Sequence, residues 1–78
     1  MDKIIIITGT SKGIGRYLCE YYLNKGFYVY GCSRSKSDLR NERYKHFKHE
    51  VSDEKKVRKM VLSIYKEHKK IDYLINNA

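Results

Sequence analysis

A run of four isoleucines at residues 4–7, followed directly by Thr8-Gly9, restricts the possible folds more than any other feature. The run is short and β-branched, and apolar and polar residues do not alternate in it. This pattern is typical of a strand buried on both faces, as in a parallel sheet. The run is also far shorter than the roughly 20 apolar residues that a membrane span needs. We therefore expect an α/β chain whose first strand lies inside a parallel sheet.

Helix and strand patterns alternate after this run. Ile14 and Leu18 stand at helical spacing, and we expect that helix to end at Asn24-Lys25-Gly26. Residues 27–32 are predicted to form the second strand. Residues 33–43 are polar and charged, and they are predicted to form a loop or a short, weakly specified helix.

The second half of the chain repeats the alternation. Residues 44–51 are predicted to form a third strand, and Ser52-Asp53-Glu54 offers an N-cap and acidic side chains for a second helix. The apolar stripe of that helix consists of Val57, Val61, Ile64 and His68. Residues 71–75 are predicted to form the fourth strand. The order strand-helix-strand-strand-helix-strand implies about four parallel strands joined by right-handed crossovers.

Length and composition narrow the classes of protein. The 78 residues allow one small domain, and the 41% apolar share is too high for a disordered tail. The net charge of +8 is compatible with nucleic-acid binding. However, Lys, Ile, Tyr and Asn are all plentiful, as an A+T-rich coding sequence would give, which favours charge spread over solvated faces. Two cysteines, Cys19 and Cys32, indicate no disulfide framework, and no signal peptide is visible, so we expect a soluble, cytoplasmic protein.

A glycine-rich turn lies between the first strand and the first helix, at Thr8-Gly9-Thr10-Ser11-Lys12-Gly13-Ile14-Gly15. Glycines there allow a tight turn, bring backbone N–H groups against a phosphate and pack the helix close to the sheet. The helix N-terminus adds unsatisfied N–H donors and a positive dipole end. The turn therefore predicts a site for a phosphate-bearing nucleotide.

The spacing of Gly9, Gly13 and Gly15 resembles that of the short-chain dehydrogenase/reductase family. Residues 70–78 are similar to the family's fourth strand and the start of its Asn-Asn-Ala-Gly motif. Glu50-Val51 stands where the family usually has Asp-Val. The resemblance covers the whole chain and implies a partial Rossmann-type fold, a doubly wound parallel sheet. Residues 1–78 would form one cofactor-binding half-domain that stops before the family's catalytic Asn, Ser and Tyr-x-x-x-Lys pair.

The resemblance also implies a set of cofactor-binding residues. They are Gly9, Thr10, Ser11, Lys12, Gly13, Ile14, Gly15, Ser33, Arg34, Glu50, Val51, Asn76, Asn77 and Ala78. In this set the glycines would line the pyrophosphate, the hydroxyls of Thr10 and Ser11 would bind ribose and phosphate, and Ile14 would lie under the cofactor. Glu50 would contact the adenine, although it is one methylene longer than the family's Asp.

Within the same set, Val51 would form a wall of the adenine pocket. Asn76 and Asn77 would either support the sheet or border the cofactor ribose.

The end of the second predicted strand indicates which dinucleotide is bound. NAD-binding proteins usually carry a carboxylate there for the ribose 2′-OH, but this chain has Ser33 followed by Arg34. A guanidinium can hold a 2′-phosphate with two hydrogen bonds, and Lys12 is placed to reach the same group. NADP is therefore expected rather than NAD, although Asp38 offers an alternative carboxylate for a ribose.

The implied function is hydride transfer between NADPH and a carbonyl or alcohol substrate, with no catalytic residue inside residues 1–78. The alternatives are a non-catalytic dinucleotide-binding module or inactive remnant, and a small basic nucleic-acid-binding protein. Three Tyr-x-x-x-Lys matches begin at Tyr21, Tyr44 and Tyr65, and they are expected by chance in a chain with eight tyrosines. His46 and His49 would face opposite sides of a strand, so no metal site is expected. An open edge on the fourth strand would favour a homo-oligomer or other self-association.

Overall fold

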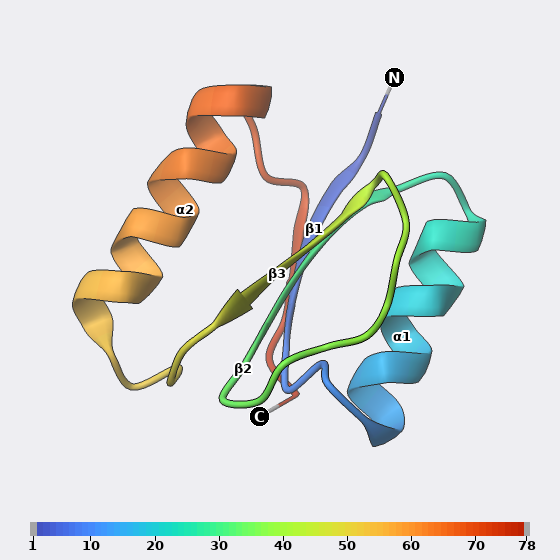
Figure 1. Ribbon diagram of the computed structural model, residues 1–78. Helices are drawn as coiled ribbons and strands as arrows, with labels where there is room; N and C mark the ends of the chain where they lie inside the picture. The colour runs from blue at the N-terminus through green and yellow to red at the C-terminus, as the bar shows by residue number, and fades with distance from the viewer. Residues whose placement is uncertain (1, 78) are drawn as a thin grey trace.

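The computed structural model describes residues 2–77, which form one parallel sheet with strand order β3-β2-β1-β4 (Figure 1). The elements are β1 (Ile4–Thr8), α1 (Gly13–Asn24), β2 (Tyr28–Ser33), β3 (Tyr44–Lys48), α2 (Glu54–His68) and β4 (Tyr73–Ile75). Strand β1 is interior, and its Ile6 lies opposite Tyr30 of β2 and Leu74 of β4. The predicted doubly wound α/β fold is confirmed.

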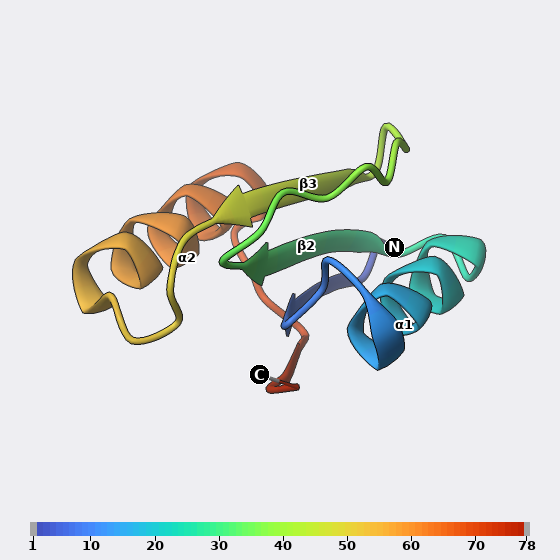
Figure 2. The same cartoon turned by 60° about the horizontal axis from the view of Figure 1, so that its bottom comes forward.

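The two helices cover opposite faces of the sheet, as Figure 2 shows. Ile4 and Ile6 pack in the cluster that contains Met60 and Ile64 of α2, whereas Ile5 and Ile7 pack on the α1 side. All residues of β1 are buried, which explains why this strand carries isoleucine on both faces. Each such side chain contributes about 1.5–3 kcal/mol through its burial. Within residues 2–77, no helix is long and apolar enough to cross a membrane.

The C-terminus of α1 is fixed by a glycine, as the sequence predicts. Gly26 has φ +86, and its N–H donates to the Leu23 carbonyl at 2.9 Å. The Phe27 N–H donates to the Tyr22 carbonyl at 3.0 Å, and the rings of Tyr22 and Phe27 lie 5.0 Å apart. These contacts form a Schellman motif with its hydrophobic closure. The motif turns the chain directly into β2.

The strand boundaries differ from the predicted ones. β2 is shifted by one residue, to Tyr28–Ser33. β3 ends at Lys48 rather than at residue 51, because its partner β2 ends at Ser33, opposite Lys48. The Ser33 carbonyl then accepts the His49 N–H. The chain then turns, with the Asp53 N–H donating to the Glu50 carbonyl at 3.2 Å. β4 begins at residue 73 rather than 71. Residues 34–43 form a loop, so the helical alternative for this segment is wrong.

Candidate functional site

A cavity of about 480 Å³ opens at the edge where the parallel strands β1 and β2 end. Ligands of open α/β sheets bind outside the carboxyl ends of the strands. We call this cavity the carboxyl-edge pocket. It is lined by Gly9, Ser11, Lys12, Cys32, Ser33, Arg34, Ser35, His49, Glu50 and Val51. Three segments that are distant in sequence thus bring predicted site residues together: the glycine-rich turn, the end of β2 and the chain after β3.

The glycine-rich turn has the backbone that its composition predicts. Gly9 and Gly13 have φ values of +70 and +63, a region that L residues with a side chain rarely adopt. Gly15 is pressed against the Gly9 carbonyl, and the Asn77 side-chain amide donates to that same carbonyl at 3.2 Å. Close packing of the turn, of α1 and of the end of β4 therefore depends on residues without a Cβ.

The N-terminus of α1 leaves its first N–H donors available for an anion. Its N-cap residue, Lys12, has no side-chain acceptor that could cap these N–H groups, and the first turn, within the described chain, carries no acidic residue. By contrast, α2 is capped by its own Asp53, whose carboxylate accepts the Lys56 N–H at 3.2 Å. Free donors, the helix dipole and the Lys12 charge together favour a phosphate at the carboxyl-edge pocket.

Arg34 and Glu50 face each other across the carboxyl-edge pocket. The Arg34 Nε lies 4.0 Å from a Glu50 carboxylate oxygen, and the two side chains are 79% and 56% exposed. An ion pair this exposed contributes little stability, so it leaves the guanidinium available to a stronger partner. The arginine and the carboxylate thus offer opposite charges to any ligand at this point.

The Thr10 side chain turns away from the pocket. It is completely buried, and its Oγ1 lies 3.4 Å from the Tyr44 hydroxyl. The Tyr44 hydroxyl fits there because it passes over Gly31, where a Cβ would collide with it. Burial raises the pKa of Tyr44 to about 12, so its hydroxyl keeps its hydrogen. Ser11 is the hydroxyl of the turn that lines the pocket.

His46 and His49 lie on opposite sides of the sheet. His46 Nδ1 lies 2.8 Å from the Tyr44 hydroxyl on the α1 side, whereas His49 Nδ1 lies 3.5 Å from Cys32 Sγ. Burial raises the pKa of the Cys32 thiol, which keeps it in its unreactive neutral form. Among residues 2–77, no three His, Cys, Asp or Glu side chains are grouped as metal ligands.

Asn76 and Asn77 fasten the end of β4 to the end of β1. The Thr8 hydroxyl donates to Asn76 Oδ1 at 3.0 Å, and the Asn77 N–H donates to Thr8 Oγ1 at 3.0 Å. Both asparagines therefore support the sheet, and neither lines the carboxyl-edge pocket. Ile14 is 70% exposed at the start of α1. Ala78 lies outside the described residues.

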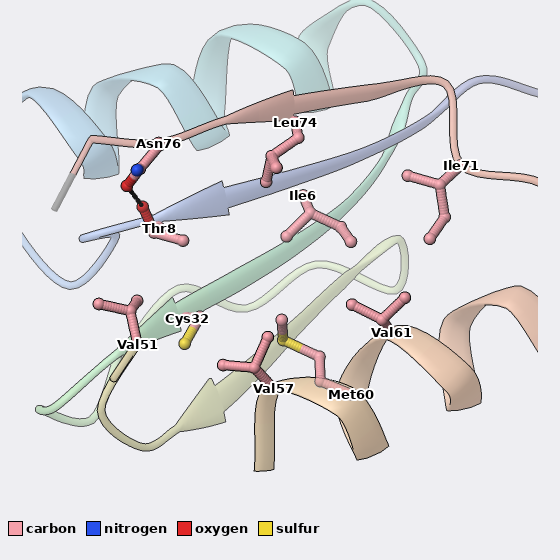
Figure 3. A pocket seen from close by; sticks show the side chains of 10 residues that line it. All are labelled: Ile6, Thr8, Cys32, Val51, Val57, Met60, Val61, Ile71, Leu74 and Asn76. Carbon is pink, nitrogen blue, oxygen red and sulfur yellow. Dashed lines mark hydrogen bonds between the residues drawn. The ribbon is translucent and has the colours of Figure 1, made fainter. Parts of the chain in front are cut away.

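A second cavity, of about 410 Å³, lies between β4 and α2 (Figure 3). We call it the β4 cavity. Its lining is mainly apolar and consists of Ile6, Thr8, Cys32, Val51, Val57, Met60, Val61, Ile71, Leu74 and Asn76. Of the predicted cofactor residues, only Val51 and Asn76 reach it. This apolar groove lies beside β4, which pairs with β1 along one edge and ends the strand order of the sheet.

The alternative carboxylate at Asp38 is already engaged. Arg16 of α1 donates from Nη1 to Asp38 Oδ1 at 2.5 Å, and this arginine lowers the pKa of that carboxyl. Asp38 does not line the carboxyl-edge pocket. The pocket therefore has Ser33 and Arg34, without Asp38, at the end of β2.

The Tyr-x-x-x-Lys matches fall in unrelated places. Tyr21 lies on α1 with the Lys25 ammonium 5.1 Å from its ring centroid, and Tyr65 is half exposed on α2. The hydroxyl of Tyr44 is held at Gly31 and Thr10. None of the three tyrosines lines the carboxyl-edge pocket.

Sequence reasoning from the glycine motif missed Thr8, Gly31, Tyr44 and the hydrogen-bonding role of His46. One signal was available: Tyr44 and His46 stand two residues apart on a strand and so share a face. The register of β2 against β3 places Gly31 opposite His46. Register between strands that are distant along the chain is not readable from one sequence.

Comparison with known proteins gives one consistent answer. The model of the short chain dehydrogenase family matches residues 3–78. The chain is 38% identical over 84 residues to an NADPH-dependent 3-dehydrocapnine reductase of Ornithobacterium rhinotracheale, covering 97% of this chain and 30% of that protein. It superposes with TM-score 0.85 on a short chain dehydrogenase of Leptospira borgpetersenii with bound NAD+, at 28% identity, covering 97% of this chain and 31% of that one.

A third similar protein, ElxO with NADP bound, has TM-score 0.86 and 29% identity, covering 100% of this chain and 35% of that one. The chain thus spans about a third of the length of these proteins. The matched residues include all three segments that line the carboxyl-edge pocket: the glycine-rich turn, the end of β2 and the chain after β3. The chain belongs to the short-chain dehydrogenase family.

Proposed function

We propose that this chain is the NADP(H)-binding part of an oxidoreductase that transfers a hydride between NADPH and a carbonyl or alcohol substrate. One observation carries the cofactor preference: Lys12, Ser33 and Arg34 meet at the carboxyl-edge pocket. A 2′-phosphate placed there gains charge-assisted hydrogen bonds, whereas a 2′-hydroxyl gains little from two cations. The similar reductase named as NADPH-dependent and the similar structure with NADP bound support this preference. Because another similar structure holds NAD+, the test of this preference compares both dinucleotides.

In this proposal the cofactor supplies the hydride, and the described residues bind and orient it. The turn and the N-terminus of α1 hold the pyrophosphate, Lys12 and Arg34 hold the 2′-phosphate, and Val51 borders the adenine. Residues 1–78 act as one cofactor-binding unit, and we place the proton-transferring groups of the reaction outside it. The substrate is therefore set by residues beyond this unit.

Titration of the purified chain with NADPH, followed by NADPH fluorescence, tests the cofactor proposal, with NADH as the comparison ligand. We expect tighter binding of NADPH. The Arg34→Ala variant should weaken NADPH binding about tenfold and leave NADH binding nearly unchanged, since only NADPH carries the 2′-phosphate.

Arg58→Ala is the matched control, because Arg58 is an exposed arginine on α2 and does not line the carboxyl-edge pocket. Loss of the same net charge there should leave both affinities as they are. Equal affinities for NADPH and NADH, or equal losses in the Arg34 and Arg58 variants, would contradict the proposed 2′-phosphate site.

A second proposal concerns the open edge of β4, which we propose pairs with β4 of a second copy. Strand β4 ends the sheet order, and Tyr73 and Leu74 are 49% and 66% exposed. The β4 cavity lies on one side of the strand, and a further groove lined by Tyr22, Phe27 and Ile75 lies on the other. Unpaired strand edges of this kind recruit other strands, and pairing about a two-fold axis satisfies both copies at once.

A further inference from the structure

The two residues on either side of Arg34 are both contacted by one side chain, His46. His46 Nε2 lies 3.0 Å from Ser33 Oγ and 2.9 Å from the Ser35 carbonyl oxygen. Ser33 and Ser35 flank Arg34, so the ring contacts the chain on both sides of the guanidinium-bearing residue. We propose that His46 is a positioning residue that fixes Arg34 and thereby determines the preference for the 2′-phosphorylated dinucleotide. This inference rests on the proposed NADP(H) function.

The hydrogen-bond chemistry of the cluster defines the role of His46 Nε2. The Ser35 carbonyl oxygen can only accept, and the Ser33 hydroxyl already donates to it at 2.9 Å. His46 Nε2 therefore carries a hydrogen and donates it. His46 Nδ1 lies 2.8 Å from the Tyr44 hydroxyl, whose pKa burial raises to about 12. Both ring nitrogens thus have a hydrogen-bond partner.

The same cluster joins the two sides of the carboxyl-edge pocket. The Tyr44 hydroxyl also lies 3.4 Å from the buried Thr10 hydroxyl, which belongs to the glycine-rich turn. The connection runs from Thr10 through Tyr44 and His46 to Ser33 and Ser35. The hydroxyl of Tyr44 occupies the space left by the missing Cβ of Gly31. The phosphate-binding turn and the Arg34 loop are therefore held at a fixed separation by side chains beneath the pocket.

Arg34 needs such support because its own side chain has little. It is 79% exposed, and its contact with Glu50 is a 4.0 Å ion pair. Ordering a loop residue costs conformational entropy, and ligand binding must otherwise supply the free energy for it. A loop that is ordered before the ligand arrives avoids this loss. Only the 2′-phosphate draws on Arg34, so the gain applies to NADPH and not to NADH.

The test compares His46→Phe with His46→Gln in titrations with NADPH and NADH. Phenylalanine fills the space without hydrogen bonds, whereas the glutamine amide can place a donor near the Ser35 carbonyl. We expect His46→Phe to weaken NADPH binding about fivefold to tenfold with NADH binding changed less than about twofold. His46→Gln should recover most of the preference.

The matched control is His68→Phe. It removes a histidine hydrogen bond, 2.5 Å to the Tyr30 hydroxyl, on the α2 side and away from the pocket. It should lower stability without changing the ratio of the two affinities. An unchanged ratio in His46→Phe, or an equal change in His68→Phe, would overturn the inference.

Amide hydrogen exchange tests the positioning step with no dinucleotide present. In His46→Phe we expect faster exchange at residues 34–36 and unchanged exchange in β1. If the wild-type chain binds neither dinucleotide, the proposed function fails, while the exchange at residues 34–36 still decides whether His46 holds the loop. Equal exchange in the wild type and in His46→Phe refutes the positioning role, whatever the titrations show.

Discussion

Gly15 packs so closely against Gly9 that a β-carbon at position 15 would collide with the Gly9 carbonyl group. The same β-carbon would lie 2.9 Å from the side-chain nitrogen of Asn77. The obstacle is backbone rather than the flexible end of a side chain, so it cannot move aside cheaply. Close approach of α1 to the turn therefore requires glycine at this position.

Gly15→Ala should lower the free energy of unfolding by about 2–3 kcal/mol, as overpacking against backbone does. It should also abolish dinucleotide binding, because the turn must open to admit the methyl group. Urea unfolding and NADPH titration measure the two effects.

Gly26→Ala is the control for a purely conformational cost. Gly26 has φ +86, and a β-carbon added there would meet no heavy atom within 4 Å. Alanine there should cost about 1 kcal/mol of stability and leave NADPH affinity as it is. If Gly15→Ala also kept wild-type affinity, the turn would not be the phosphate site.

The sequence was sufficient to predict the architecture because the relevant signals are local. The isoleucine run, the glycine after α1 and the acidic N-cap of α2 each act within a few residues. The boundaries of β3 and β4 were not predictable in the same way, since a strand ends where its neighbour ends. β3 stops at Lys48 because its partner β2 ends at Ser33. The last bond between the two segments is the one from the His49 N–H to the Ser33 carbonyl.

The candidate site likewise contains residues that local motifs predict and residues that only contacts between distant segments position. Lys12, Arg34 and Glu50 were identified from motif positions, and the structure places all three at one pocket. The inward turn of Thr10 was not foreseeable, because it depends on Tyr44, which is 34 residues away. That contact exists only where Gly31 leaves room for a hydroxyl. Burial of this kind is decided by packing between strands and not by any local pattern.

Glu50 places a negative charge beside the proposed 2′-phosphate site. Its carboxylate lies 4.0 Å from the Arg34 guanidinium and lines the same pocket. Glu50→Gln removes a negative charge next to the proposed 2′-phosphate and frees Arg34, while the amide can still hydrogen-bond. NADPH affinity should rise about twofold to fivefold, the range expected for exposed charge pairs, and NADH affinity should change less.

Parallel titrations of Glu42→Gln, an exposed glutamate elsewhere on the surface, control for the change in net charge. Weaker NADPH binding by Glu50→Gln would show instead that the carboxylate itself holds the cofactor.

Asp72 makes stability depend on acid pH. Its carboxylate accepts the Ile4 N–H at 2.8 Å and lies 3.2 Å from the Lys70 ammonium, and these partners lower its pKa. A carboxyl whose pKa is lowered by folding stabilises the native state above its ordinary pKa. That stabilisation is lost as the pH falls through the lowered value. Wild-type stability should therefore decline between about pH 5 and pH 2.

Asp72→Asn keeps an acceptor for the Ile4 N–H but cannot titrate, so its decline over this range should be shallower. Asp38, whose pKa is lowered by Arg16, adds a slope of the same sign to both proteins. The quantity to compare is thus the difference between the two urea-unfolding series across pH. If the stabilities of the wild type and of Asp72→Asn fall by the same amount across this pH range, Asp72 does not cause the acid sensitivity.

Leu74 is the side chain through which the β4 edge should associate. It is 66% exposed in the middle of β4 and lines both apolar grooves beside that strand. In the proposed pairing of two β4 edges its apolar surface becomes covered, which favours association by about 25 cal/mol for each Å² removed from water. Leu74→Lys places a charge at this edge, the device by which natural edge strands avoid pairing.

Sedimentation velocity should therefore show concentration-dependent association for the wild-type chain and a monomer for Leu74→Lys. Leu62→Lys, at a residue 60% exposed on α2, supplies the same change away from the sheet edge and should associate as the wild type does. A wild-type monomer at all concentrations would refute the pairing. Equal loss of association in both variants would show that the added positive charge, and not the β4 edge, controls association.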